Sequence, residues 1–187
     1  FPTYNWEKMA KDGYAWWKAR LAKMAEYFDA FRIDHVLGFF RIWEIPIDAV
    51  HGLLGYFNPA LPYSAEELAS YGFDMDEGKW TTPLTSDWVL WGIFGEYAEE
   101  AKSTFFKNGR ILPAYNTQRK VVEKIAGYDQ KSVVMRDGLL TLLDDVLFIE
   151  DPRKKGYYHP RISGQQTYIY RSLDAYRRSA FDALYSD

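Results

Sequence analysis

Three neighbouring residues, Arg32, Asp34 and His35, have the types and spacing of a reactive carboxylate with two supporting groups. On a strand, residues two positions apart point the same way, so the Arg32 guanidinium can lie within about 4–6 Å of the Asp34 carboxylate. A cation at that distance favours the ionised carboxylate, which is the form that attacks as a nucleophile. His35 could donate a hydrogen bond to a substrate hydroxyl. The alternative is an Arg–Asp pair that only fixes a loop at a strand end.

A helix and a strand must position these side chains. An amphipathic helix is predicted over 12–28, because apolar residues recur there at steps of three and four. The next segment, 30–35, is predicted to be a strand, since Phe31 and Ile33 alternate with charged residues. A helix followed closely by a strand is half of a βαβ unit. In (β/α) barrels catalytic side chains project from the C-terminal ends of strands, where the three residues lie.

Aromatic residues are the unusual feature of the composition: 7 Trp, 15 Tyr and 12 Phe make up 18% of the chain. Such rings either fill a core, because they bury much area with few rotatable bonds, or stack on the apolar C–H faces of sugar rings. For Tyr4 and Trp6, which lie close to the reactive residues, both interpretations stay open. Packing is predicted for the tryptophans that lie in helical or strand patterns, namely Trp16, Trp17, Trp43, Trp88 and Trp91.

Composition excludes several classes of function. With no Cys, the chain has no disulfide scaffold, thiolate metal site or cysteine nucleophile. It carries 23 Lys+Arg against 26 Asp+Glu, so the basic surplus of a nucleic-acid interface is missing, and no apolar run approaches the ~18 residues of a membrane span. Dinucleotide and P-loop motifs are absent and the histidines lack metal-ligand spacing, so neither cofactor nor metal is expected. A closed (β/α)₈ barrel needs at least about 200 residues, and the chain has 187.

The rest of the chain predicts a mainly α fold with a few short strands. A strand is expected over 39–45, and Ser64 with Glu67 has the pattern of a capping box that begins a short helix. Residues 48–165 are interpreted as a mainly helical insert between pieces of a partial (β/α)₈ TIM barrel. The other predicted elements are helices over 86–106, 117–126 (capped by Asn116) and 136–143, a strand over 146–149, and a helix from about 172.

Several short motifs occur together within residues 1–47. They are Pro2-x-Tyr4-Asn5-Trp6-Glu7, Gly13-x-x-x-Trp17, Phe31-Arg32-Ile33-Asp34-His35, Gly38-Phe39 and Trp43-Glu44-Ile45-Pro46. This combination resembles the nucleophile region of the 4-α-glucanotransferases, the amylomaltase or disproportionating-enzyme family of glycoside hydrolases. It is most similar to the plant-cytosolic and related bacterial type, which carries a long insert after the nucleophile strand.

The resemblance implies a role for each matched residue. Asp34 would be the nucleophile that forms a covalent glucosyl–enzyme intermediate, Arg32 would orient it and keep it charged, and His35 would contact the sugar in the cleaved subsite. Tyr4 and Trp6 would lie in the acceptor-side loop and bind substrate. The implied partners are maltose, malto-oligosaccharides and a glucan acceptor, with no cofactor, no nucleic acid and no membrane, in a cytoplasmic setting.

The resemblance also implies that the chain is a central piece of a larger barrel. Residues 1–47 would belong to the catalytic barrel with the nucleophile strand, 48–165 would be the insert, and 166–187 a helix that leads back to the barrel. The acid/base carboxylate and the carboxylate that stabilises the transition state would lie beyond residue 187, in the remainder of the parent barrel. The acidic residues within 144–151 do not sit in the family's acid/base motif.

Two other classes of function remain open. One is a non-catalytic glucan-binding or interaction module formed by the aromatic-rich insert. The other is an amylase-type hydrolase, in which water replaces the acceptor sugar. Transfer products from maltose would indicate the transferase, and free glucose alone would indicate hydrolysis.

The 187-residue chain by itself is expected to be inactive. Retaining chemistry needs a second carboxylic acid about 5–5.5 Å from the nucleophile, and the resemblance assigns that group to a later part of the parent protein. Chromatography of maltose incubated with the purified chain should therefore reveal neither glucose nor longer oligosaccharides, whereas the full-length protein should form both. Glucose release or disproportionation by the chain alone would contradict this prediction.

Overall fold

Helices are the predominant regular elements of the structure, a computed structural model that describes residues 3–34 and 36–186. The α-helices are α1 (Trp6–Lys11), α2 (Ala15–Ala25), α3 (Ala65–Ser70), α4 (Asp87–Phe94), α5 (Ala98–Phe105), α6 (Gln118–Lys124), α7 (Gln130–Leu143), α8 (Tyr168–Arg171) and α9 (Ala175–Ser186). The strands are β1 (Ile42–Glu44), β2 (Tyr56–Asn58), β3 (Tyr63–Ser64), β4 (Phe106–Lys107), β5 (Arg110–Ile111), β6 (Phe148–Glu150) and β7 (Tyr157–Pro160). The predicted mainly α class with a few short strands is therefore confirmed.

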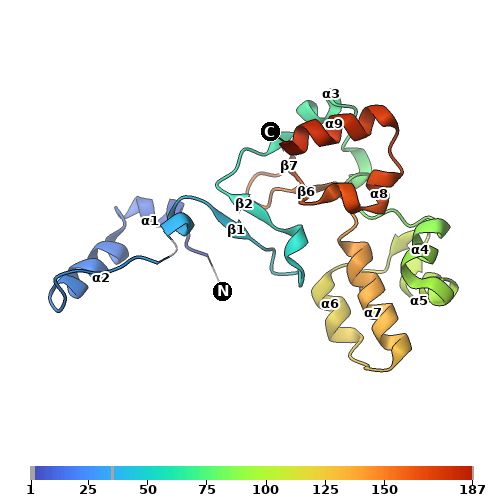
Figure 1. Ribbon diagram of the computed structural model, residues 1–187, viewed down its shortest axis with the longest axis horizontal. Coiled ribbons are helices and arrows are strands. Elements are labelled where there is room, and N and C mark those ends of the chain that lie inside the picture. Colours follow the sequence, from blue (N-terminus) through green and yellow to red (C-terminus); the bar gives the residue numbers. More distant parts are fainter. Residues whose placement is uncertain (1–2, 35, 187) are drawn as a thin grey trace.

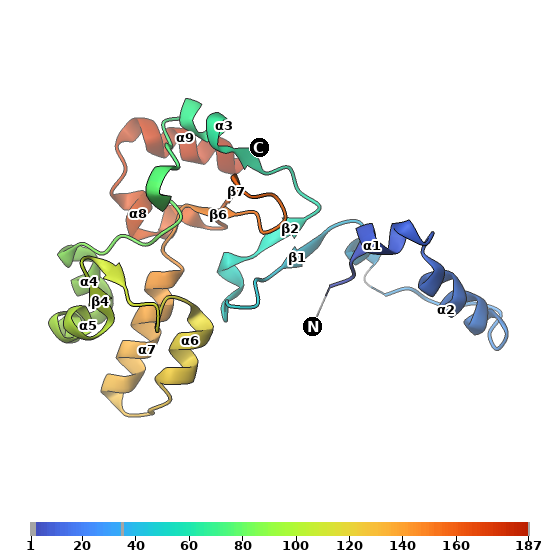
Figure 2. The same cartoon turned by 180° about the vertical axis from the view of Figure 1, so that it is seen from behind.

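The helices α1 and α2 stand apart from the other helices, and the β1–β2 hairpin lies between the two parts (Figure 1). The view from behind has the same arrangement (Figure 2). In the described part of the chain, no helix is both long enough and apolar enough to cross a membrane.

Side-chain caps determine where the two N-terminal helices begin, and a tight turn separates them. Asn5 accepts a hydrogen bond from a backbone N–H in the first turn of α1, and Asp12 does the same for α2. Between the helices Gly13 has a φ of +66°, a conformation that costs glycine little. The helix predicted over 12–28 is confirmed in type but is shorter, and no side chain of α1 or α2 is fully buried.

The strand predicted over 30–35 is wrong for residues 30–34, which form no strand. A strand needs a neighbour to pair its N–H and C=O groups. Every strand pair in the described part is antiparallel and lies elsewhere in the chain, so the expected half of a βαβ unit is not formed there. Phe31 and Ile33 remain 45% and 47% exposed. The alternating pattern therefore lacks the partner that would make it a strand.

The β1–β2 hairpin follows directly. The strand predicted over 39–45 forms only in its second half as β1, because the 3₁₀-helix η1 (Val36–Phe39) takes the first residue of that range. Close packing inside the hairpin requires glycine at position 55, since a Cβ on Gly55 would lie 2.3 Å from Trp43 Nε1.

One hydrophobic core gathers α4, α5, α6 and α7. The single helix predicted over 86–106 is wrong, because Gly95, with a φ of +55°, ends α4 and redirects the chain into α5. A Cβ on Gly138 of α7 would lie 2.5 Å from the Phe94 ring, so glycine lets α7 approach α4. The fully buried residues of this core include Val89, Phe94, Ala101, Val121, Leu139 and Leu142.

Polar caps decide where α6 and α7 begin. Thr117, not Asn116, caps α6, because its side chain accepts from the Lys120 N–H at 3.4 Å while Asn116 Oδ1 accepts from Lys120 Nζ instead. Asp129 caps α7, so this helix begins well before the predicted range 136–143. The first turn of α7 is polar, so the spacing of apolar residues does not indicate where this helix begins.

A second core lies between α3, the β3–β7–β6 sheet, α8 and α9. The predicted capping box of α3 is confirmed, since Ser64 and Glu67 exchange hydrogen bonds of 2.7 and 3.2 Å. The helix expected within 166–187 is two helices, because Asp174 accepts from a backbone N–H and begins α9 anew. The strand predicted over 146–149 forms slightly later, as β6. The largest fully buried side chains here are Phe73, Phe148, Phe181, Leu68 and Leu147.

Two adjacent carboxylates at the end of α7 connect the two cores. Asp145 is 4% exposed and accepts hydrogen bonds of 2.7 and 2.9 Å from two backbone N–H groups in the first turn of α8. Burial raises the pKa of Asp145, and those two N–H groups offset only part of the rise. Asp144, equally buried, accepts from Gln118 Nε2 at 2.8 Å and lies 2.7 Å from His51 Nδ1.

Replacing Asp145 by alanine should destabilise the fold strongly. The change leaves two buried N–H groups of α8 without a partner, at about 1–3 kcal/mol each, so we expect the free energy of unfolding to fall by about 3 kcal/mol. Urea denaturation followed by circular dichroism measures this. Asp76→Ala, which removes an exposed carboxylate, should change the free energy by less than about 0.5 kcal/mol. Equal losses in both variants would contradict the prediction.

Candidate active site

The Arg32 and Asp34 side chains meet, as the sequence predicts, with Arg32 Nε 2.7 Å from Asp34 Oδ1. Both are exposed, at 88% and 77% of the side-chain surface. An exposed ion pair contributes only about 0–1 kcal/mol to stability, so fold stability does not account for the pair. Within the described residues no hydrogen bond to Asp34 Oδ2 is present. The pairing fixes the orientation of a carboxylate that remains open to a ligand.

His35, the third residue of the motif, lies outside the described residues. Its predicted contact with the sugar remains a prediction.

Tyr4 and Trp6 belong to a cluster of rings that joins α1, α2 and η1. Their ring centroids are 5.2 Å apart, Trp6 stacks on Trp17 at 6.3 Å and 19°, and Phe39 lies 5.5 Å from Trp6. Tyr4 is 44% exposed and Trp16, 6.0 Å from it, is 47% exposed. The rings pack on one another, as the packing interpretation predicts, while Tyr4 stays partly exposed. The binding of substrate by Tyr4 and Trp6 remains a prediction.

Glu44 in β1 is a buried carboxylate to which the sequence analysis gave no role. It is 7% exposed, and four side chains donate to its two oxygens. The donors are Thr3 (2.9 Å), Tyr56 (3.2 Å), Asn58 (3.0 Å) and Arg153 (2.8 Å). The only sequence signal for this residue was its membership of the Trp43-Glu44-Ile45-Pro46 motif.

The donors to Glu44 come from three parts of the chain. Thr3 belongs to the N-terminal segment, Asn58 to β2, and Arg153 to the loop between β6 and β7. Burial raises the pKa of Glu44, but the hydrogen bonds from these three residues more than offset burial and hold the pKa below its ordinary value of 4.5. An ionised Glu44 therefore ties the strand that follows the Asp34 segment to the β6–β7 loop.

An aromatic stack reinforces the same junction. The Tyr56 ring lies parallel to the His159 ring at 5.2 Å, and His159 Nε2 lies 2.8 Å from Asp151 Oδ2. Burial raises the pKa of Asp151, but the hydrogen bonds that it accepts, first from His159, outweigh burial and lower it. Asp151 and His159 therefore make structural contacts. The sequence has no acid/base motif of the family around 144–151.

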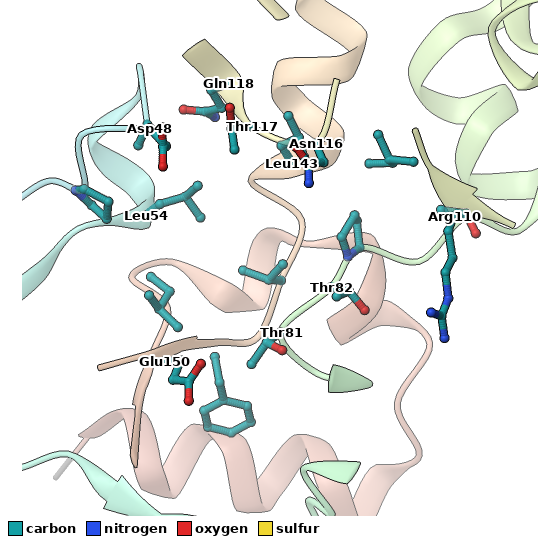
Figure 3. A pocket seen from close by; sticks show the side chains of 18 of the residues that line it. Asp48, Leu54, Thr81, Thr82, Arg110, Asn116, Thr117, Gln118, Leu143 and Glu150 are labelled. Atoms are coloured by element: carbon teal, nitrogen blue, oxygen red, sulfur yellow. The ribbon is translucent and has the colours of Figure 1, made fainter. Parts of the chain in front are cut away.

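A hollow of about 620 Å³, with a mainly apolar lining, lies between the loop after β1, the β4–β5 hairpin, the start of α6 and the segment from α7 to β6. Figure 3 shows Asp48 and Leu54 at one side of it, Arg110 at another, and Glu150 and Thr81 across from them. Several of its hydroxyls are already bonded to the backbone. None of the predicted site residues lines the hollow.

Among residues 3–34 and 36–186, no group of three or more His, Cys, Asp or Glu side chains could hold a metal ion.

Comparisons with known proteins identify the family of the chain. The family profile described as 4-alpha-glucanotransferase, glycoside hydrolase family 77, matches residues 1–180, and the chain therefore belongs to this family. The 4-alpha-glucanotransferase DPE2 of Oryza sativa subsp. japonica is 37% identical over 198 aligned residues, which cover 100% of this chain and 21% of the rice protein.

The alignments with bacterial relatives cover shorter stretches of the chain. The 4-alpha-glucanotransferase of Aquifex aeolicus is 39% identical over 92 residues, covering 41% of this chain and 18% of that protein. That of Streptococcus pneumoniae is 53% identical over 45 residues, covering 24% of this chain and 9% of its own length. The chain thus spans about a fifth or less of each relative. No solved structure matches it.

The Glu44 junction should give the stability a characteristic pH dependence. The pKa of Glu44 is lowered on folding. The stabilisation that ionised Glu44 gives to the fold is therefore complete above about pH 4.5, and it is lost as the pH falls through the pKa that Glu44 has in the folded protein. Glu44→Gln should lower the free energy of unfolding by about 1–3 kcal/mol at pH 7, the range of charge-assisted hydrogen bonds. The deficit should shrink below pH 4.5 in urea titrations at several pH values.

Glu123→Gln, at an exposed position of α6, is the matched control and should follow the unmodified chain at every pH. A deficit of Glu44→Gln that stays constant between pH 7 and the acid end would contradict the assigned role.

Proposed function

We propose that the chain is part of a retaining 4-α-glucanotransferase, in which Asp34 attacks the anomeric carbon of an α-1,4-linked glucosyl unit. The observation that carries the proposal is the 2.7 Å bond between Arg32 and Asp34 within a segment that the family profile covers. Arg32 orients the carboxylate, and one oxygen is left to form the covalent bond. The bond from the anomeric carbon to the oxygen of the leaving sugar breaks as the ester to Asp34 forms, and another sugar hydroxyl then displaces Asp34 from the glucosyl unit.

The second carboxylic acid of this reaction belongs to another part of the parent protein. Retaining enzymes place it about 5–5.5 Å from the nucleophile, where it acts first as acid and then as base. Asp144, Asp145 and Asp151 are poor candidates, since each is held by hydrogen bonds inside the fold. On this proposal residues 1–47 form part of the catalytic barrel, 48–165 the insert, and 166–187 the return to the barrel.

The acceptor side of the site is proposed to use Tyr4 and Trp6. The exposed part of the Tyr4 ring suits the apolar C–H face of a glucosyl unit, and Trp6 lies half-buried beside it, in contact with Phe39 of η1. Maltose and malto-oligosaccharides would be donors and a glucan the acceptor. No cofactor takes part, His35 contacts the sugar, and the resemblance to the plant-cytosolic type supports a cytoplasmic setting.

The nucleophile is tested by Asp34→Asn in the full-length protein. The amide cannot form the glucosyl ester, so transfer from maltose should fall by at least about 10⁴-fold, a loss typical of removing a nucleophile. Product chromatography measures transfer, and circular dichroism should be unchanged because the side chain is exposed. Asp29→Asn, another exposed carboxylate of the same segment, is the matched control and should retain activity.

Near-normal turnover in Asp34→Asn would refute the assignment of the nucleophile. Release of free glucose from maltose with no longer products in the unmodified protein would instead favour an amylase-type hydrolase.

A further inference from the structure

Two tryptophans of α4 are largely exposed, although their helical spacing predicted packing. Trp88 is 50% exposed and Trp91 is 69% exposed, so that prediction is wrong for both. The helix buries its opposite face instead, through Val89, Leu90 and Phe94.

Positions 88, 91 and 92 share one face of the helix by the i, i+3, i+4 rule. Gly92 adds no side chain to this face, and Gly95 follows as the residue that ends the helix. A Cβ on Gly95 would find nothing within 4 Å, so the surface at this end of α4 is open. The two indoles therefore present uncovered faces to solvent.

A third ring extends this surface. Tyr168, at the start of α8, lies 5.5 Å from Trp88 between ring centroids, and Arg171 covers it at 5.1 Å. Both ribbon views place α4 beside α8 (Figures 1 and 2). Gly92 is required here, because a Cβ at that position would lie 2.7 Å from the Tyr168 hydroxyl. We call Trp88, Trp91 and Tyr168 the α4 platform.

A hollow of about 350 Å³ adjoins the platform between α4 and α7, and Gly92 and Tyr168 belong to its wall. That volume lies in the lower range of small-ligand sites. Asp137 and Thr141, one helical turn apart on α7, add a carboxylate and a hydroxyl to the lining. One carboxylate oxygen of Asp137 pairs with Arg136 at 3.2 Å, and no hydrogen bond occupies the other among the described residues.

The size and charge of the platform favour a small neutral ligand. A Trp side chain carries up to about 250 Å² of surface, so the exposed fractions of the two indoles amount to about 300 Å². A stable protein interface needs about 800 Å² per partner. Two ion pairs lie nearby, Asp87 with Lys102 and Arg136 with Asp137, and Arg171, the cation over Tyr168, donates to the Gln166 carbonyl. A neutral ligand fits these surroundings better than a strongly charged one.

We propose that the α4 platform with its adjoining hollow is a second glucan-binding site, which holds an α-1,4-linked chain away from the Asp34 segment. Glucosyl rings stack through their C–H faces on the indoles and on Tyr168, and their hydroxyls donate to Asp137 and exchange hydrogen bonds with Thr141. The ligand class rests on the proposed function. The existence of the site rests on the exposed rings and the hollow.

The test is affinity electrophoresis of the full-length protein in gels that contain glycogen. Trp88→Ala combined with Trp91→Ala should weaken the retardation by glycogen at least 5-fold, and Asp137→Asn should weaken it by a smaller factor. Tyr128→Ala, which removes a ring that is 93% exposed outside the platform, is the matched control and should behave as the unmodified protein. Circular dichroism checks that each variant is folded.

Hydroxyl-radical footprinting gives a second readout that does not depend on the variants folding. Glycogen should reduce the oxidation of Trp88 and Trp91 in the unmodified protein and leave Tyr128 unchanged. Undiminished oxidation, or equal retardation of the double variant and the control, would overturn the site even if transfer from maltose is intact. Loss of a dimer in the double variant without loss of retardation would identify the platform as a protein interface and also overturn the proposal.

Failure of the proposed function has a different signature. It would appear as unchanged transfer in Asp34→Asn, whatever the platform binds.

Discussion

Buried carboxylates are the constraint on which the arrangement of helices depends. A carboxylate removed from water must find hydrogen-bond donors, because an unpaired buried charge costs several kcal/mol. Asp144 and Asp145, adjacent at the end of α7, meet this requirement in opposite directions, one toward α6 and the loop after β1, the other toward the first turn of α8. The two hydrophobic cores share few side chains, and these hydrogen bonds fix the position of one core relative to the other.

Glu44 applies the same constraint at a second junction. Its donors come from the N-terminal segment, from β2 and from the loop between β6 and β7, so one carboxylate fixes three segments that are far apart in the sequence. Because β1 follows the Asp34 segment closely, this junction also limits where that segment can lie. The Arg32–Asp34 pair, in contrast, is exposed and contributes little to stability, which suits a carboxylate whose partner is a substrate.

The aromatic side chains of this protein occupy two kinds of position. Those of the second core pack edge to face and are fully buried, as for Phe73, Phe148 and Phe181. Those around Tyr4 and on α4 pack only in part and keep open faces beside polar groups. Exposed ring faces of this kind are the surfaces on which we propose that a glucan stacks.

Sequence alone determined what depends on local rules. The capping box at Ser64 follows from spacing. Arg32 and Asp34 do meet, but in a segment that is not the strand from which their meeting was predicted. Tertiary structure decided the rest, because strand pairing and burial depend on segments that are distant in sequence. Residues 30–34 alternate like a strand but find no partner, and Glu44 gains its role through donors that lie far away in the sequence, such as Arg153. Trp88 and Trp91 have helical spacing but lie on the largely exposed face of α4.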